Sequence, residues 1–193
     1  SVLRDMDGRI PLILDGGPCR FGVESTIVDC TGPVAVILRP GAITREMLTE
    51  VLGGVKLDPA LVGANTIPKA PGMKYKHYAP KAPMTLLEGA PAKMAAAFRR
   101  QVRHLQKDGH TVGILASDEV CAALSDFVPV TLRKSYGPQG DLLAIAARIY
   151  EALIAFDDTD ADTLLGEGTT DQGLGLAIMN RLHKASGFHT IEI

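Results

Sequence analysis

Two hydroxyl-bearing residues, Ser25 and Thr26, show the clearest chemical potential in the first part of the chain. They stand at the start of a β-branched run that ends at Asp29. A hydroxyl group donates and accepts hydrogen bonds at once, so this pair could bind a small polar ligand. The alternative is a turn in which both hydroxyls bond their own backbone. The residue types alone leave both interpretations open.

A single arginine, Arg39, follows the apolar residues 34–38 and precedes the pair Pro40-Gly41. At the end of a strand, its planar guanidinium group could bind a phosphate or a carboxylate through two parallel hydrogen bonds. The competing interpretation is a surface arginine, or one paired with an acidic side chain.

Residues 67–87 form a cationic segment in a chain that is otherwise slightly acidic. They contain no Asp or Glu, and their charged and aromatic side chains are Lys69, Lys74, Tyr75, Lys76, His77, Tyr78 and Lys81. Lysines and an imidazole could neutralise phosphates while a tyrosine ring packs on a base or a sugar. The alternative is a solvated run of charge. Ordering such a segment costs chain entropy, so we expect a ligand or a domain surface to hold it.

The composition is that of an ordinary globular protein, and it excludes several function classes. Of the 193 residues, 46% are hydrophobic and 22% are charged, and 20 Lys and Arg oppose 22 Asp and Glu. This balance excludes a strong chain-wide attraction to nucleic acid or to an anionic membrane. No apolar run approaches the roughly 18 residues of a membrane span, so we expect no membrane partner.

The three cysteines, Cys19, Cys30 and Cys121, are odd in number and widely spaced. This pattern fits neither a disulfide framework nor a paired-cysteine zinc site. The first residues also lack the apolar core of a secretory signal. We therefore expect no metal site and a cytoplasmic location.

The elements that must position the candidate residues fall into three stretches. Residues 1–54 carry strand patterns at 10–14, 25–29 and 34–38, of which the last two predict a hairpin. Thr44 can cap a short helix that follows them.

Residues 55–83 contain five prolines and little periodicity, which predicts an extended linker. Residues 84–193 alternate strand and helix patterns, which predicts a mostly parallel, Rossmann-like α/β sheet with helices on both faces. The expected strands are 84–87, 112–116, 128–132, 163–166 and 189–193, and the expected helices begin at about residues 91, 119, 141 and 174.

Two weaker patterns lie in the last stretch. Gly173-Leu174-Gly175 precedes a helix but lacks the third glycine of a dinucleotide fingerprint, so we interpret it as a tight turn with close helix packing. Arg99 and Arg103 share one face of a helix; solvent exposure is the simple interpretation and RNA contact the alternative.

Taken in chain order, residues 8–17, 22–29, 38–41 and 70–80 resemble the Sua5 family, whose members are threonylcarbamoyl-AMP synthases. Residues 173–185 resemble the C-terminal domain of the same family. The resemblance implies that residues 1–54 are the C-terminal part of a YrdC-like α/β catalytic domain. It further implies that residues 55–83 are a linker over the active site and that residues 84–193 are the Rossmann-like Sua5 domain.

The resemblance also implies a reaction. L-threonine, bicarbonate and ATP, with Mg²⁺ accompanying the ATP, would give threonylcarbamoyl-AMP and pyrophosphate. The product would supply the tRNA-modification machinery that forms threonylcarbamoyladenosine at position 37. By the same resemblance, Ser25 would bind L-threonine, Arg39 and Tyr78 would bind ATP, and Lys74 and His77 would be accessory residues of the matching segment.

The chain departs from the family pattern in one respect, which concerns the first half of the catalytic domain. The basic and Ser-x-Asn motifs of the first half of the family's catalytic domain have no counterpart here. We therefore expect this chain to need a missing N-terminal half and to lack synthase activity alone. The alternative hypothesis is an RNA-binding or partner-binding Rossmann-like module without catalysis.

Overall fold

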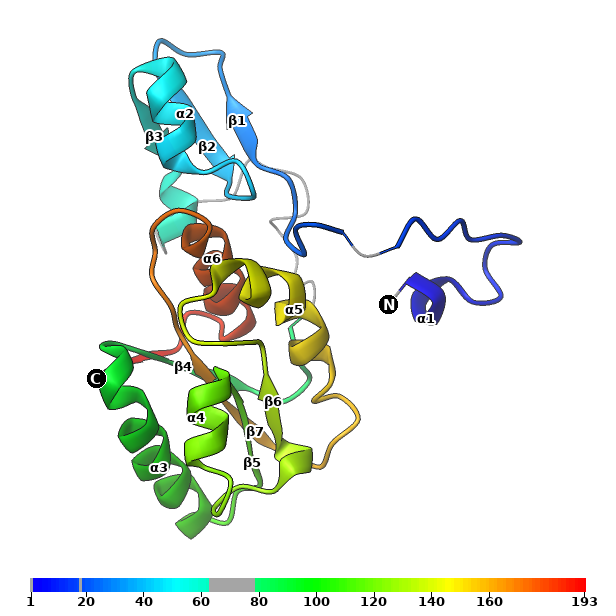
Figure 1. Cartoon of the computed structure of the whole chain (residues 1–193), viewed down its shortest axis with the longest axis vertical. Coiled ribbons are helices and arrows are strands. Elements are labelled where there is room, and N and C mark those ends of the chain that lie inside the picture. The colour runs from blue at the N-terminus through cyan, green and yellow to red at the C-terminus, as the bar shows by residue number, and fades with distance from the viewer. Residues whose placement is uncertain (1, 18, 63–78) are drawn as a thin grey trace.

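A computed structural model describes residues 2–17, 19–62 and 79–193 of the chain (Figure 1). The described strands form two sheets, one with three strands and one with five. The five-stranded sheet and its helices make up the larger body, and the three-stranded sheet lies beyond helix α6 at one end of it (Figure 1).

The smaller sheet has the order β1-β2-β3, with strands β1 (Ile27–Asp29), β2 (Ala35–Arg39) and β3 (Val55–Leu57). The first two strands form the expected antiparallel hairpin, and β3 joins β2 in parallel. Strand β3 therefore lies within residues 55–83, the range expected to be linker. A short 3₁₀ helix, Pro59–Val62, follows it.

Helix α2 (Arg45–Leu52) makes the crossover from β2 to β3, and its ends follow the sequence signals. The Thr44 hydroxyl accepts a hydrogen bond from the backbone N–H of Met47, which satisfies one of the free donors of the first turn. Gly53 ends the helix with φ of 72°, a left-handed conformation that glycine adopts without strain. The helix nevertheless has no buried residue.

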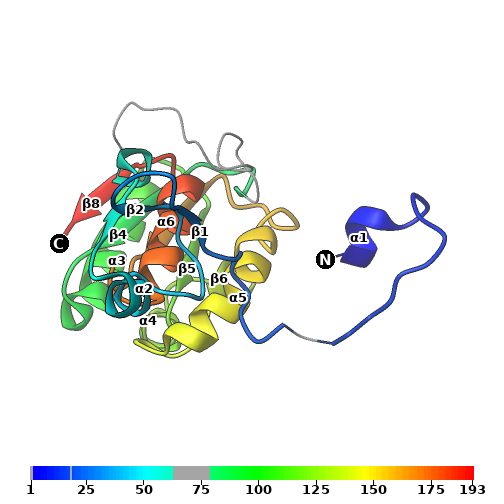
Figure 2. The ribbon, with the colours of Figure 1, turned by 90° about the horizontal axis from the view of Figure 1, so that it is seen from above.

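The described residues before β1 form no strand, so the strand expected at residues 10–14 is wrong. Helix α1 (Val2–Met6) is followed by a non-helical stretch that extends away from the rest of the molecule in both views (Figures 1 and 2). Leu12 and Leu14 are exposed along it. A strand needs a neighbour to satisfy its backbone, and no described strand lies beside these residues.

The larger sheet is entirely parallel, as expected, and has the strand order β6-β5-β7-β4-β8. Its strands are β4 (Met84–Glu88), β5 (Val112–Ala116), β6 (Arg133–Ser135), β7 (Thr163–Glu167) and β8 (Thr190–Glu192). The strand expected at 128–132 is wrong: Val130–Leu132 is a 3₁₀ helix, and β6 begins directly after it. Pro129 stands before that helix, where its fixed φ favours a turn over a ladder.

Four helices cover the two faces of the larger sheet. Their bounds are α3 (Pro91–Lys107), α4 (Asp118–Ala123), α5 (Leu142–Ile154) and α6 (Gly175–Ala185). Buried residues of α3 and α4 share one apolar core, whereas those of α5 and α6 share another. This division places one helix pair on each face, the arrangement of a Rossmann-like fold.

Within the described residues, no helix combines the length and the apolar character that a membrane span requires.

Candidate functional site

The structure brings the two principal candidate residues into direct contact. Arg39 Nε donates a hydrogen bond to the backbone oxygen of Ser25 at 2.9 Å, and Arg39 Nη2 donates to Ser25 Oγ at 3.0 Å. Arg39 closes strand β2, and the β1–β2 register shifts between Ile27 and Val28, opposite that end of the strand. Such a bulge redirects the chain that leads into it, which here carries Ser25.

The loop that follows Arg39, residues 40–43, packs against the segment that carries Ser25. Thr26 Oγ1 donates a hydrogen bond to the backbone oxygen of Ile43 at 2.7 Å. A side chain at Gly41 would place its Cβ 2.3 Å from the backbone oxygen of Glu24, so only glycine fits there. The loop and the Ser25 segment are therefore packed backbone against backbone.

The chain just before Ser25 is anchored on the larger body. Val23 is buried within the core that contains α5 and α6. A Cβ at Gly22 would lie 2.4 Å from the backbone oxygen of Ala146, which shows how closely the segment approaches α5. Residues 22–24 thus connect the smaller sheet to the larger one.

Glu24 lies at the centre of a polar network between the two parts. Tyr150 on α5 donates its hydroxyl proton to Glu24 Oε2 at 2.6 Å, and Arg181 Nε on α6 donates to the same oxygen at 2.7 Å. Arg181 is 6% exposed and also forms the ion pair with Glu24 through Nη2 at 2.6 Å. Two helices of the larger body therefore hold the residue that precedes Ser25.

The pKa values in this network follow from burial and charge. Burial opposes ionisation of Glu24, but the Tyr150 hydrogen bond and the Arg181 charge outweigh it and lower the pKa of the Glu24 carboxyl. Burial raises the pKa of the Tyr150 hydroxyl, and the bond to Glu24 adds to that effect. Glu24 is therefore a carboxylate and Tyr150 a neutral donor near pH 7.

Lys184, one turn after Arg181 on α6, brings a further cation to this region. Burial, together with the charges of Arg181 and Arg39, lowers the pKa of Lys184 to about 8, while the charge of Glu24 opposes this shift. Lys184 therefore lies within electrostatic reach of Arg39 on the smaller sheet. Arg39, Arg181 and Lys184 thus bring three cationic side chains to the surroundings of Glu24.

Two cavities adjoin the junction. The larger, about 710 Å³, lies between residues 19–24 and α5, and Glu24 and Tyr150 line it. The smaller, about 470 Å³, lies between α2 and the start of α6, where Gly173 N donates a hydrogen bond to Glu46 Oε1 at 3.3 Å. Gly175 is packed closely in that turn, because a Cβ there would lie 2.1 Å from the Thr170 oxygen.

Of the candidate site residues predicted from the sequence, Ser25 and Arg39 contact each other in the structure. Tyr78, Lys74 and His77 lie outside the described residues. Sequence reasoning missed the Glu24 network altogether, since the positions of its partners on α5 and α6 are fixed only by tertiary packing. The sole available signal was the place of Glu24 inside the Gly22 to Asp29 cluster.

The basic face of α3 is occupied within the chain. Arg99 Nη2 donates to Asp126 Oδ1 at 3.0 Å, and both Arg99 and Arg103 lie over the ring of Phe127, at 5.5 and 5.4 Å from its centroid. Arg103 is nevertheless exposed and Arg99 partly exposed, so the expected solvent exposure of this face is confirmed. The RNA-contact alternative stays a prediction. No group of three or more metal-binding side chains occurs in the part of the chain that the structure describes.

Comparison with known proteins gives a consistent result. A family model described as "Threonylcarbamoyl-AMP synthase, C-terminal domain" matches residues 43–187. The chain is 42% identical to the threonylcarbamoyl-AMP synthase of Bacillus subtilis, covering 99% of this chain and 53% of the relative. It is 37% identical to that of Pyrococcus abyssi, covering 100% of this chain and 54% of the relative.

A solved structure, that of P. abyssi Sua5 complexed with L-threonine, superposes with a TM-score of 0.85 at 37% identity. The superposition covers 100% of this chain and 54% of the solved one. The chain thus spans about half the length of the relatives that it matches.

Proposed function

The chain belongs to the Sua5 family of threonylcarbamoyl-AMP synthases, and from this premise we propose that it contributes part of the active site that forms threonylcarbamoyl-AMP from L-threonine, bicarbonate and ATP. The enzyme would act as a nucleotidyltransferase. The observation that carries the proposal is the contact between Arg39 and Ser25, held in a cationic region at the junction of the two sheets.

The reaction requires positive charge and an organised polar site. The amino group of L-threonine and bicarbonate form a carbamate and release water. A carbamate oxygen then attacks the α-phosphorus of ATP, and the bond to the pyrophosphate leaving group breaks. Two anions meet in this step, so fixed cations stabilise its transition state. Arg39 supplies such a charge at the end of β2.

We assign Ser25 to L-threonine binding and Arg39 to the phosphates of ATP. The Ser25 hydroxyl accepts from Arg39 in the structure, and it still has a proton to donate to a substrate oxygen. Tyr78 would bind ATP from the segment that precedes β4, with Lys74 and His77 as accessory cations. The L-threonine complex of the P. abyssi relative supports threonine as the amino-acid substrate.

The larger body would position the threonine-binding serine. Glu24 precedes Ser25 in the chain, and Tyr150 and Arg181 fix its carboxylate. A fixed neighbour limits the motion of Ser25 relative to Arg39, and small displacements of a binding group reduce rates strongly. We therefore propose that α5 and α6 act as a clamp on the substrate site.

We propose that Mg²⁺ accompanies ATP to the site. Its chemistry would be to neutralise phosphate charge.

We further propose that the product feeds tRNA modification in the cytoplasm. A threonylcarbamoyl adenylate is a mixed anhydride, which water can hydrolyse. The next reaction must therefore transfer its threonylcarbamoyl group before hydrolysis occurs. We propose adenosine 37 of tRNA as the acceptor of that group, as the family resemblance implies.

The test is a comparison of this chain with a chimera in which it replaces the matching half of the B. subtilis synthase. Pyrophosphate release from ATP, L-threonine and bicarbonate is measured for both. We expect activity in the chimera and none in the chain alone, because the described part of the smaller sheet has only three strands to enclose two substrates. An inactive but folded chimera would contradict the proposed function, and an active isolated chain would contradict the need for a missing half.

A further inference from the structure

A separate cavity of about 440 Å³ opens at the carboxyl edge of the larger sheet. It lies where β4 and β7 are neighbours. The chain leaves β4 toward α3 on one face and leaves β7 toward α6 on the other, so the two connections diverge. This divergence is the topological switch point at which open α/β sheets bind ligands.

The cavity contains a buried carboxylate, that of Glu167 at the end of β7. This residue is 2% exposed. Its Oε2 accepts a hydrogen bond from the backbone N–H of Ser117 at 2.7 Å, and its Oε1 accepts from Gln139 Nε2 at 2.9 Å. Both donors are neutral, and the salt bridges found among the described residues do not include Glu167.

A buried carboxylate usually has a cation or a metal to offset its desolvation. No Lys or Arg lies among the described residues that line this cavity. Each oxygen of Glu167 accepts one bond from the protein, although a carboxylate oxygen can accept two. The group is therefore oriented by the protein and retains capacity for a charged donor.

A second acidic residue near the cavity also favours a positively charged ligand. Burial raises the pKa of the Tyr136 hydroxyl, and the charges of Glu167 and Glu119 add to the effect. Glu119 also accepts a hydrogen bond from the backbone N–H of Gln139 at 2.8 Å. Two acidic side chains, Glu167 and Glu119, therefore lie close to the cavity and favour a cation over a phosphate there.

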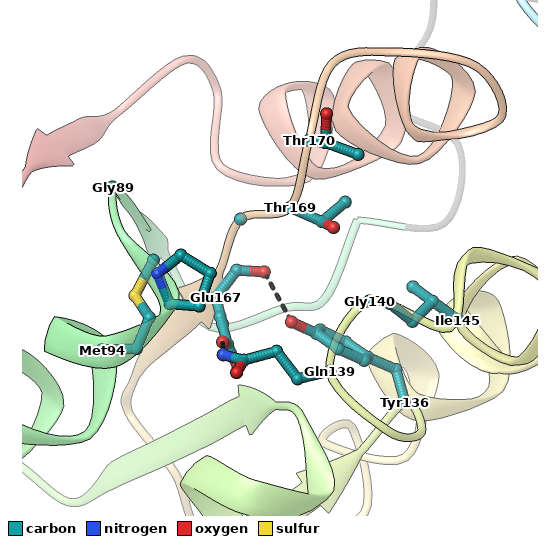
Figure 3. Close-up of a pocket in the computed structure, with 11 residues that line it drawn as sticks. Gly89, Met94, Tyr136, Gln139, Gly140, Ile145, Glu167, Thr169 and Thr170 are labelled. Carbon is teal, nitrogen blue, oxygen red and sulfur yellow. Dashed lines mark hydrogen bonds between the residues drawn. The ribbon is translucent and has the colours of Figure 1, made fainter.

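The rest of the cavity wall is largely apolar. Figure 3 shows Met94 on one side of Glu167 and Tyr136 on the other, with Tyr136 donating its hydroxyl proton to the Glu167 backbone oxygen at 3.1 Å. Pro91, Met94 and Ile145 contribute apolar surface. The Tyr136 ring could also attract a cation through its π face.

We propose that this cavity is a second ligand site, which binds a small primary amine with its ammonium group on the Glu167 carboxylate and its apolar body against Pro91, Met94 and Ile145. The volume of the cavity is within the range of ligand pockets, and its few polar groups converge on one charge. All of its residues belong to the larger body, between Gly89 and Thr170. The inference therefore does not depend on the proposed synthase activity.

The test uses two probes that differ in a single group, 2-phenylethylamine and 2-phenylethanol. Each is titrated into the full chain, and binding is followed by amide chemical shifts in NMR. We expect the amine to bind about tenfold more tightly than the alcohol or better, because a hydrogen bond to a charged partner is the stronger kind. The largest shifts should fall on the amides of Gln139, Gly140 and Gly168.

Two variants and one control decide the outcome. Glu167→Gln keeps the shape of the side chain and should remove the preference for the amine, whereas Glu192→Gln on exposed β8 should leave it unchanged. If Glu167→Gln fails to fold, Thr169→Phe replaces it as the test variant. Thr169 lines the cavity, so a phenylalanine there should fill part of it while Glu167 is retained. This variant should weaken amine binding about tenfold. Equal binding of the two probes, no binding of the amine, or unchanged binding in the variant that folds would overturn the proposal.

Discussion

The two sheets of this chain differ in how completely they bury their own apolar residues. The larger sheet has a core on each face, and residues such as Phe98 and Ile149 are fully buried there. Among the described residues, the core of the smaller sheet contains only Ile37, Val55 and Leu61 as buried residues. The neighbouring residues of the smaller part include the exposed apolar side chains of Ile43, Met47, Val51 and Leu52.

The candidate substrate residues lie on the less complete of the two parts. Ser25 and Arg39 belong to the smaller sheet, yet Gly22, Val23 and Glu24 are anchored on α5 and α6. This contrast supports our proposal that the smaller part carries the substrate-binding groups and the larger part fixes their position. Each of the following predictions tests that division.

The largest expected effect is on stability and lies in the larger body. Leu153 on α5 is 1% exposed, so Leu153→Ala should lower the free energy of unfolding by about 2–5 kcal/mol, since it removes buried contacts and leaves a cavity. Leu14→Ala is the matched control, because Leu14 is 88% exposed and the change should cost less than about 0.5 kcal/mol. Urea denaturation measures both, and equal losses would contradict the burial of Leu153 in the core of the larger body.

An intermediate effect is expected at the network that joins the two parts. Arg181→Ala leaves the half-buried Glu24 carboxylate without its cation and should cost about 1–3 kcal/mol, while Tyr150→Phe removes one hydrogen bond and should cost about 1 kcal/mol. Because both bond the same oxygen, the double variant should not show simple additivity. The measurement is a double-mutant cycle by urea denaturation. A coupling free energy of zero between Arg181 and Tyr150 would show that the network is not cooperative.

The smallest expected effect is a pH dependence from Lys184. Its folded pKa of about 8 lies below the usual lysine value of 10.5, so the folded state releases this proton first as pH rises. The unfolded chain then binds more protons, and Lys184 makes stability rise with pH between about 8 and 10.5. Lys184→Met should flatten that rise. The measurement is the free energy of unfolding of both proteins from pH 7 to 10.5, and identical slopes would contradict the placement of Lys184 beside Arg39 and Arg181.

Local sequence signals were sufficient to predict most of the larger body. Its helices begin where Pro91 and Asp141 mark a first turn, and its strands are apolar runs of the expected length. Such signals depend on nearby residues only, so they do not need the tertiary fold to be known.

Predictions that depended on a partner element were less successful. Residues 10–14 have a strand-like composition but no described strand beside them. Strand β3 was not predicted, because a strand of three residues shows little periodicity. Ser25 and Arg39 were chosen from residue type and resemblance, and the structure adds that they bond each other. The Glu24 network could not be predicted, since Arg181 is 157 residues away in the sequence.

The clamp by α5 and α6 is the central claim, and the KM for L-threonine in the B. subtilis chimera tests it most directly. Arg181→Ala frees Glu24 and should raise that KM about tenfold or more with a smaller change in the KM for ATP, and Arg181→Lys should recover part of the loss because it restores the charge. A folded Arg181→Ala chimera with an unchanged KM for L-threonine would contradict the claim that the larger body positions Ser25.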